Sequence, residues 1–304
     1  MVSQRKQAAR DLAGFLLLDK APGMTSNRAL QRARRVFDAR KAGHTGSLDP
    51  LATGMLPVCF GAATKVAQFA LAANKTYEVT GLLGSATDTG DADGKVICEE
   101  PVSGIDRQTI EAVLAQFRGP IEQVPPMYSA LKHQGRRLYE LARAGIEVER
   151  AVRQVQIHEL VLTDCDLPSF SLRVSCSKGT YIRSLVADIA VALGTVGHVV
   201  ALRRVSVDPF AGQRMWRLDE LEELAESGQS LDAECLLPVD CVLAHWPRIT
   251  LDAERERRIR HGQKLQLAGS DTAGLHAVYS EEAVFIGIGE VDTEGRLAPR
   301  RIFL

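Results

Sequence analysis

The sequence predicts an α+β protein with a mixed sheet and a second, smaller β-rich domain at the C-terminal end. Strand and helix patterns follow one another over residues 14–210 without the strict strand–helix–strand alternation of a doubly wound sheet. From about Ile249 onward, the pattern changes to short strands separated by glycine-containing turns. The chain has 304 residues, a length that accommodates one large domain or two.

The first part of the chain predicts two strands and two helices around a loop. The apolar run GFLLLDK predicts a strand, and Thr25 or Ser26 can cap the helix predicted over residues 27–39. After the loop, a second apolar strand is predicted near Met55–Phe60. Residues 63–74 then show helical spacing.

The rest of the chain predicts most of the sheet, three further helices and a linker. In order, the patterns indicate alternating strands and turns over 75–100, a helix over 106–117, a proline-led loop running into a basic helix over 124–145, two strands joined by a turn at Leu167–Pro168, a helix over 180–194, a strand over 199–210, and a linker over 238–247.

The composition is that of an ordinary globular protein. Hydrophobic residues make up 45% and charged residues 25% of the chain, which are typical fractions. No apolar run approaches the length of a membrane span. The N-terminal apolar run AGFLLL is followed by Asp19 and is too short for a secretory signal. We therefore expect a cytoplasmic protein that does not enter a membrane.

The cysteines predict buried free thiols and no metal site. No two of the six form a C-x-x-C pair, and none lies near histidines at metal-ligand spacing. In a reducing compartment, cysteines in apolar runs are expected to remain free and buried. The six are Cys59, Cys98, Cys165, Cys176, Cys235 and Cys241.

The charge distribution favours a polyanionic partner. The formal net charge of −1 excludes a protein that is basic throughout, but it does not exclude a local nucleic-acid-binding surface. Residues 1–41, 132–143 and 255–264 are each rich in arginine and lysine. Each cluster alone is explained by a solvated helix face, but the three together raise the expectation of a nucleic-acid partner.

The stretch KAGHTGSLDPLATGMLPV, residues 41–58, does not have the periodicity of a helix or a strand in its first half. Its glycines and Pro50 break it into turns, and it carries one acid, Asp49, and one histidine, His44. Two interpretations compete. Asp49 is either a turn residue that accepts hydrogen bonds from backbone N–H groups, or a catalytic carboxylate held by a rigid scaffold.

Three further places carry side chains that could join such a site. Tyr77 lies at a strand start, and Tyr181 and Arg183 lie where a strand turns through Gly179 into a helix. The run ALRRV places a leucine and two arginines on a late strand. Each has an alternative explanation, namely packing for the tyrosines and a surface charge for Arg183.

The sequence lacks the common motifs of nucleotide binding and nucleophilic catalysis. There is no G-x-S-x-G, no Walker loop, no G-x-G-x-x-G and no Cys–His motif. The run DTGDADG resembles a calcium loop, but the closing glutamate is misplaced and no helices flank it, so an acidic turn is predicted. A single essential carboxylate that acts as nucleophile or base without a cofactor therefore fits the pattern.

Taken together, these stretches resemble the TruB family of tRNA pseudouridine-55 synthases. GHTGSLDPLATGMLPV is similar to the defining motif of the family, and the match runs from about Gly14 to the C-terminus. Two departures are Ala21, where the family commonly has proline, and the basic extension before Gly14. Colinear blocks that resemble the same family are GFLLLDKAPGMTSN, KTYEV, TDTGDADG, VPPMYSALKHQGRRLYELARAGIEVER, CSKGTYIRSL, HVVALRRV and GRLAPRR.

The resemblance implies the pseudouridine-synthase fold, with a mixed, largely antiparallel sheet, and a small PUA-like RNA-binding domain after it. It implies a basic N-terminal extension over 1–13, a catalytic domain over 14–247 and a PUA-like domain over 248–304. Within the catalytic domain, residues 125–150 would form a thumb-like segment that contacts RNA. We expect the protein to be a monomer.

The resemblance also implies a reaction and its residues. Uridine 55 in the T-stem-loop of tRNA would be converted to pseudouridine without a cofactor or metal: the base leaves C1′, turns and is rejoined through C5. Asp49 aligns with the catalytic aspartate of the family, and Tyr77 with the tyrosine that stacks on the flipped base. The other aligned residues of the nucleotide site are Tyr181 in the pocket, Arg183 as the partner of the aspartate, His44, Lys20 and Leu202.

Physical chemistry is consistent with these roles. Flipping the base out of its stack costs a few kcal/mol, and stacking on Tyr77 would return about 1–3 kcal/mol. Burial raises the pKa of a carboxyl group and a nearby cation lowers it, so we hypothesise that Arg183 keeps Asp49 ionised. Three first steps are open: attack of Asp49 at C1′, attack at C6, or removal of a sugar proton with elimination to a glycal.

Three other functions are compatible with parts of the pattern. The protein could be an RNA-folding chaperone for the tRNA elbow, or a pseudouridine synthase that acts on another RNA. It could also be a hydrolase of sugars, but such enzymes usually need two acids that flank the scissile bond. The sequence indicates no second acid.

Overall fold

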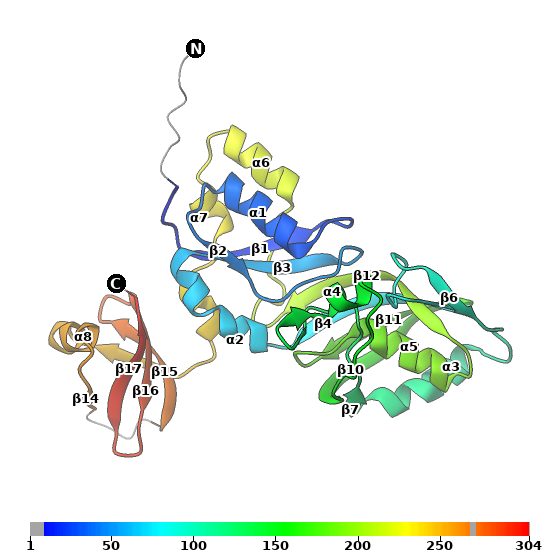
Figure 1. The fold of residues 1–304 in the computed structure, drawn as a ribbon. Helices are drawn as coiled ribbons and strands as arrows, with labels where there is room; N and C mark the ends of the chain where they lie inside the picture. The colour runs from blue at the N-terminus through cyan, green and yellow to red at the C-terminus, as the bar shows by residue number, and fades with distance from the viewer. Residues whose placement is uncertain (1–8, 268–271, 304) are drawn as a thin grey trace, which may run out of the picture.

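The computed structural model describes residues 9–267 and 272–303, and Figure 1 shows how they are arranged. The first part of the predicted basic extension, residues 1–8, lies outside the described residues. The described chain forms one eight-stranded and one five-stranded sheet, together with two short two-stranded sheets. The predicted α+β class with a β-rich C-terminal part is therefore confirmed.

The eight-stranded sheet has the order β1-β3-β12-β4-β11-β10-β7, with β2 pairing with β3. Every neighbouring pair is antiparallel except β3 and β12, which are parallel. The sheet is thus mixed and largely antiparallel, as expected. Its strands are β1 (Gly14–Lys20), β2 (Ala42–His44), β3 (Thr53–Phe60), β4 (Lys75–Leu83), β7 (Gly119–Gln123), β10 (Arg153–Asp166), β11 (Ser169–Cys176) and β12 (Gly197–Val207).

The parallel junction between β3 and β12 is short. Among the described residues, only Arg203 with Thr53 and Arg204 with Gly54 are in register there. Gly54 has a φ of +94°, and a Cβ at this position would lie 2.2 Å from the backbone oxygen of Arg204. Only glycine allows the two backbones to approach so closely. The loop that carries Asp49 enters β3 at this junction.

Helices cover the sheet in two groups (Figure 1). Helices α1 and α6 pack against each other above β1, while α5 packs against β12 and β4, and α3 packs against β10. Thr25 caps α1 as predicted, because its hydroxyl accepts a hydrogen bond from the Arg28 N–H at 3.2 Å. The α-helices are α1 (Ser26–Val36), α2 (Ala67–Ala72), α3 (Arg107–Leu114), α4 (Leu138–Arg143), α5 (Ile182–Ala192), α6 (Leu218–Glu226), α7 (Leu231–Cys235) and α8 (Ala253–Arg260); the 3-10 helices are η1 (Gly61–Lys65), η2 (Ala115–Phe117) and η3 (Val239–Leu243).

Residues 124–145 form a loop that runs into a basic helix, as predicted, but the loop contains a hairpin that was not predicted. A hairpin of β8 (Lys132–His133) and β9 (Arg136–Arg137) takes up the middle of the segment, and α4 is short. Gln134 and Gly135, at the hairpin turn, have φ values of +49° and +86°, a conformation that interrupts a helix. The tight turn at Gln134 and Gly135 therefore separates the loop from the helix α4.

The five-stranded sheet has the order β13-β15-β16-β17-β14 and makes up the C-terminal region (Figure 1). Its β-rich nature follows the expectation for residues after Ile249. Helix α8 contacts β13, β14 and β17. The strands are β13 (Arg248–Leu251), β14 (Leu265–Gln266), β15 (Gly274–Ser280), β16 (Phe285–Val291) and β17 (Arg296–Ile302); the remaining short strands of the protein are β5 (Ser85–Thr87) and β6 (Val96–Glu99).

The predicted linker over 238–247 is packed, not free. Leu243 is fully buried, and the Trp246 ring lies 4.7 Å from the Phe69 ring in an edge-to-face arrangement. The same apolar cluster contains Phe15 on β1 and Tyr279 on β15. The two sheets therefore share a hydrophobic core. The polar and proline residues of this segment are typical of a linker, so the sequence did not indicate that it is packed.

This shared core makes a prediction for stability. Leu243→Ala should lower the free energy of unfolding by about 2–5 kcal/mol, because it removes a fully buried side chain from the core. The matched control is Leu275→Ala on β15, whose exposed side chain should contribute less than about 1 kcal/mol. Urea unfolding measures both variants, and equal effects would mean that the segment is a loose linker.

Candidate active site

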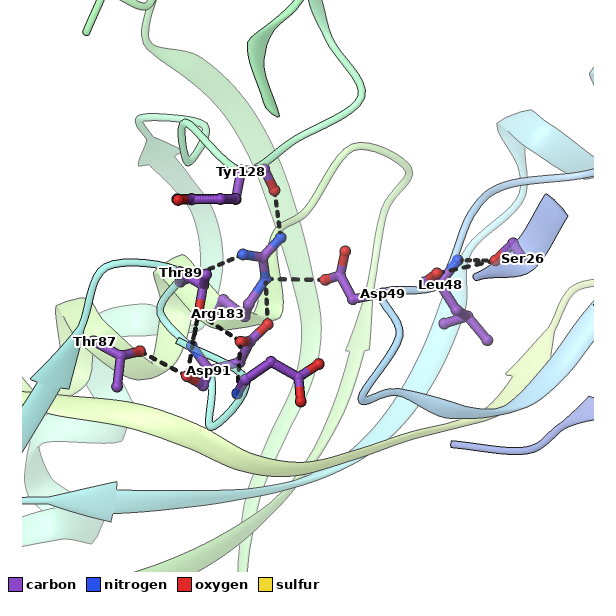
Figure 2. Close-up of polar contacts among 9 residues, drawn as sticks. Ser26, Leu48, Asp49, Thr87, Thr89, Asp91, Tyr128 and Arg183 are labelled. Atoms are coloured by element: carbon purple, nitrogen blue, oxygen red, sulfur yellow. Dashed lines mark hydrogen bonds and ion pairs between the residues drawn. The ribbon is translucent and has the colours of Figure 1, made fainter. Parts of the chain in front are cut away.

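The loop between β2 and β3 is fixed at its centre by a serine from α1. The Ser26 hydroxyl accepts a hydrogen bond from the Leu48 N–H at 2.7 Å and donates one to the Leu48 carbonyl at 3.0 Å (Figure 2). Leu48 is buried and immediately precedes Asp49. Because these bonds satisfy both polar groups of the Leu48 backbone, the position of the next residue is well defined.

The carboxylate of Asp49 points toward Arg183 at the start of α5 (Figure 2). The Arg183 Nε lies 2.9 Å from Asp49 Oδ2. The Asp49 side chain is 39% exposed, whereas that of Arg183 is only 5% exposed. Among the described residues, no backbone N–H donates a hydrogen bond to this carboxylate. The interpretation of Asp49 as a turn-stabilising residue is therefore wrong.

Arg183 is itself held by a set of acceptors around its guanidinium (Figure 2). Its Nη2 donates to the Tyr128 carbonyl at 2.7 Å, its Nη1 donates to the Thr89 carbonyl, and its Nε lies 3.7 Å from Asp91 Oδ2. The Asp91 side chain is buried and accepts hydrogen bonds from the Thr89 hydroxyl at 2.6 Å and the Asp93 N–H at 3.2 Å. These contacts leave the guanidinium little freedom to turn away from Asp49.

Two opposing effects act on the ionisation of Asp49. Burial raises the pKa of its carboxyl group above the ordinary value of 3.8, and the negative charge of Asp91 acts in the same direction. The positive charge of Arg183 and its hydrogen bond lower the pKa, as does the charge of Lys20. Burial is the largest effect and the pKa is raised overall, so Arg183, the strongest of the influences that favour the ionised form, opposes this shift without cancelling it.

Lys20 supports the loop from beneath. Its side chain is fully buried, and its ammonium donates to the carbonyls of Ala21 at 3.0 Å, Met24 at 2.8 Å and Pro50 at 3.2 Å. Burial lowers its pKa to about 8, while the charge of Asp49 opposes this effect. Two of these carbonyls belong to the turn between β1 and α1, and the third belongs to Pro50 beside Asp49, so Lys20 joins the two segments. Its expected place in the nucleotide site stays a prediction.

Tyr77 and Leu202 lie on neighbouring strands beside the loop. Each is 8% exposed, and both belong to the same apolar cluster. In the β4–β12 register, Leu202 is opposite Val79, and Arg204 is opposite Tyr77. The tyrosine ring and the leucine therefore border one cluster on the sheet, although little of either faces solvent in this structure.

His44 ends β2 and is half-buried. Its Nδ1 is buried and has no hydrogen-bond partner among the described residues. Burial, followed by the positive charge of Arg204, lowers the pKa of the imidazole below 6.5. The ring is therefore neutral at pH 7.

Tyr181 is held at the start of α5 by the buried Gln123 at the end of β7. The Gln123 amide accepts from the Tyr181 N–H at 3.0 Å and donates to the Tyr181 carbonyl at 3.2 Å. This pair of bonds mimics a strand pairing and fixes the turn that leads to Arg183. Burial raises the pKa of the Tyr181 phenol, so it keeps its proton at neutral pH.

The three basic clusters differ in how much of their charge is free. In 255–264, Arg257 pairs with Glu254 at 3.1 Å and Arg260 pairs with Glu256 at 2.8 Å, so this cluster is largely a balanced helix face. In 132–143, no arginine or lysine forms an ion pair with a described carboxylate. Part of the first cluster is also paired, through Arg32 with Glu222 and Arg40 with Asp11.

Two kinds of feature are absent from the part of the chain that the structure describes. No group of three or more histidine, cysteine, aspartate or glutamate side chains is arranged there to hold a metal ion. No helix in that part is long and apolar enough to cross a membrane. All six cysteines are free, with Cys98 exposed, which differs from the prediction that they are buried.

The chain matches known sequence families along almost its whole length. Residues 34–182 match the N-terminal domain of TruB family pseudouridylate synthases. Residues 183–244 match the C-terminal domain of tRNA pseudouridylate synthase B, and residues 247–303 match the C-terminal region of pseudouridine synthase II TruB. The chain belongs to the TruB family of pseudouridylate synthases.

Relatives and solved structures are consistent with this membership. The chain is 52% identical to tRNA pseudouridine synthase B of Chromohalobacter salexigens over 98% of this chain and 96% of that protein. It is 49% identical to the protein of the same name from Nitrosococcus oceani, over 99% and 98%. A solved Cbf5-Nop10-Gar1 complex contains a chain with 25% identity and a TM-score of 0.72, over 96% of this chain and 85% of that one. A chain of an H/ACA RNP with a substrate RNA shares the fold at a TM-score of 0.73 and 23% identity, with coverage of 96% and 85%.

Asp91 of this TruB-family protein was not predicted from the sequence. The run DTGDADG indicates only an acidic turn and no second acid, whereas the structure places Asp91 beside Arg183. The burial of Asp91 arises because the turn pairs with a distant strand: the Ala92 N–H donates to the Val199 carbonyl at 2.9 Å. No local pattern encodes that contact. Gln123 was missed as well, since an isolated glutamine at a strand end has no distinguishing signal.

The anchor beneath Asp49 can be tested by stability. Ser26→Ala should lower the free energy of unfolding by about 1–3 kcal/mol, because the buried polar groups of Leu48 lose their partner. Ser47→Ala is the matched control, since Ser47 is an exposed residue of the same loop. Urea unfolding of both variants measures the difference, and an unchanged Ser26→Ala protein would contradict this role.

The electrostatic role of Arg183 can be tested without an activity assay. Arg183→Met should raise the pKa of Asp49 further, because the cation that favours the charged carboxylate is removed while burial stays. The protonated form of Asp49 would then persist to higher pH. A titration of the Asp49 carboxyl carbon by NMR measures this pKa directly.

The control for this titration is Arg173→Met on β11, which removes a surface arginine that lies 3.5 Å from Glu78. It should leave the pKa of Asp49 unchanged. An Asp49 pKa that is the same in Arg183→Met and in the unsubstituted protein would refute the role of Arg183.

Proposed function

We propose that this protein isomerises uridine 55 in the T-loop of tRNA to pseudouridine, with Asp49 as the catalytic carboxylate. The relatives named tRNA pseudouridine synthase B, at 48–52% identity over nearly the whole chain, support the reaction on tRNA. The observation that carries the assignment to Asp49 is its pairing with the buried Arg183 at 2.9 Å, on a loop held by Ser26 and Lys20.

The geometry leaves one carboxylate oxygen for the substrate. Asp49 Oδ2 faces Arg183, while Oδ1 has no hydrogen-bond partner among the described residues, and the side chain is 39% exposed. An everted uridine would cover this remaining surface and exclude water from the carboxylate. Lower solvent access raises the pKa of Asp49 further by desolvation but also strengthens its interaction with Arg183, so the carboxylate would depend on Arg183 to stay ionised as the site closes.

The remaining residues would receive the base. Unstacking costs a few kcal/mol, and the Tyr77 ring would return about 1–3 kcal/mol if the uracil stacks on it. Leu202 would form an apolar wall that keeps water from the detached base, and His44 would line the nucleotide site as a neutral imidazole. Tyr181 keeps its proton because burial raises the pKa of its phenol, and it would serve as a proton-transfer partner.

The chemistry is a balanced rearrangement. The bond from C1′ to N1 breaks, a bond from C1′ to C5 forms, C5 loses a proton and N1 gains one. Asp49 can begin this sequence by attack at C1′, by attack at C6, or by removal of a sugar proton, and each route uses the same free oxygen. A hydrolytic role with Asp91 as the second acid is disfavoured, because Asp91 is buried and bonded to Thr89 and Asp93.

RNA positioning would come from the thumb-like segment over 125–150. Its arginines and lysine at 132–143 form no ion pairs with described carboxylates, which leaves their charge available for phosphates. Residues 14–247 would act as the catalytic domain and 248–304 as a PUA-like RNA-binding domain. We propose a monomer as the acting unit, and the reaction as proposed belongs to the cytoplasm.

The proposed function predicts a specific product and a specific loss. An unmodified tRNA transcript incubated with the protein should gain pseudouridine at position 55, as mapped by chemical labelling and primer extension. Asp49→Asn should lower the rate at least about 10³-fold, because the group that begins the reaction is neutralised. Binding of tRNA and the unfolding midpoint should stay close to those of the unsubstituted protein.

The control is Asp219→Asn, which makes the same change of acid to amide on the exposed face of α6. It should retain full turnover. Turnover by Asp49→Asn, or product at a different uridine, would refute the proposal. If Asp49→Asn still refolds misfolded tRNA as well as the unsubstituted protein, the chaperone activity is separate from the isomerisation.

A further inference from the structure

Arg204 is a buried cation that the proposed chemistry does not use. It is only 2% exposed and lies on β12 directly opposite Tyr77. Its neighbour Arg203 pairs with Asp19 at 2.8 Å, whereas Arg204 forms no ion pair with any carboxylate in the described ranges. Buried charged groups are usually paired, so this position requires an explanation.

The guanidinium of Arg204 bonds to the chain on both sides of Asp49. Its Nε donates to the Met55 carbonyl at 2.7 Å, and its Nη2 donates to the Gly46 carbonyl at 3.1 Å. Gly46 precedes Asp49 in the loop, and Met55 follows it in β3. One side chain therefore ties together the two ends of the catalytic loop.

The same guanidinium also acts on two other proposed site residues. Burial raises the pKa of the Tyr77 phenol, and the positive charge of Arg204, which lies directly opposite Tyr77 in the β4–β12 register, acts in the other direction. The charge of Arg204 also contributes to the lowered pKa of His44. Arg204 thus reaches the loop of Asp49, the stacking ring and the histidine from a single strand.

We propose that Arg204 is a positioning residue that joins the Asp49 loop to Tyr77 and so fixes the separation between the carboxylate and the stacking ring. The inference rests on the proposed function. The two walls of the site are the Asp49 loop, which leads into β3, and Tyr77 on β4. Strands β3 and β4 are not neighbours, and β12 between them pairs with β3 over only two residue pairs. Arg204 adds side-chain bonds where backbone pairing is scarce.

The chemistry of arginine suits this role. A guanidinium presents several N–H donors in fixed, coplanar directions, whereas a lysine ammonium is a compact point charge on a flexible stem. Arg204 uses Nε and Nη2 toward two separate carbonyls, and it lies directly opposite Tyr77 on the neighbouring strand. Lysine would keep the charge but not this geometry.

The test compares Arg204→Lys with Arg203→Lys, the same substitution at the adjacent position on β12. For each variant, kcat and KM are measured with unmodified tRNA, together with the Kd for tRNA and the thermal unfolding midpoint. Arg204→Lys should lower kcat about tenfold, equivalent to about 1.4 kcal/mol, with the Kd for tRNA within about twofold. Arg203→Lys should keep kcat within about twofold.

A double-mutant cycle identifies the path of the effect. In a Tyr77→Phe background, which lacks the phenol, Arg204→Lys should lower kcat by a smaller factor than in the unsubstituted protein, because the two residues act in part through one contact. Fully independent effects would contradict the link between Arg204 and Tyr77.

The other outcomes are equally decisive. Unchanged kcat in Arg204→Lys, or an equal loss in Arg203→Lys, would refute the positioning role. An Arg204→Lys protein that is unfolded where Arg203→Lys is folded would show that Arg204 serves the core instead. If the unsubstituted protein forms no pseudouridine, the proposed function itself fails, and this result is distinct from all the others.

Discussion

The ion pair between Asp49 and Arg183 is the interaction on which the site depends. A carboxylate near an apolar cluster tends to take up a proton, since burial disfavours its charged form. Arg183 counters this tendency at 2.9 Å, and its own orientation is fixed by two backbone carbonyls and by Asp91. The pair is therefore one end of a buried network, with the partly exposed Asp49 as the member that can meet a substrate.

The sheet determines where this network can form. The β3–β12 junction is short and requires Gly54, and the loop that leads into it is held from three directions by Ser26, Lys20 and Arg204. These three side chains bond to backbone groups, so they fix the path of the chain. The Asp49 side chain pairs instead with Arg183. Such support on rigid elements is what a reactive group requires if its geometry is to be reproducible.

Much of the fold follows from local patterns in the sequence. The apolar runs at β1 and β3, the Thr25 cap of α1 and the short strands after Ile249 are encoded by residues that lie next to one another. The features that were missed depend on distant contacts. Asp91 is buried because its turn pairs with Val199, and the segment with Trp246 is ordered because it packs on Phe69.

The same division holds for the site residues. The turns around Asp49 are visible in the sequence, but periodicity alone could not distinguish a catalytic acid from a turn acid, and only the family resemblance indicated Arg183 as its partner. The expected place of Lys20 beside the nucleotide comes from the resemblance alone, because alignment gives a position but not a direction. Its burial beneath Pro50 depends on the pairing of β1 with β3, which no local pattern reports.

The most direct test of the central claim is a crystal structure of Asp49→Asn bound to a T-stem-loop RNA. The account predicts that uridine 55 is everted, with its ring on Tyr77, its C1′ beside the side chain at position 49, and Arg183 still directed toward that side chain. A uridine that remains stacked within the RNA loop, with position 49 facing bulk solvent and remote from any ribose, would contradict it.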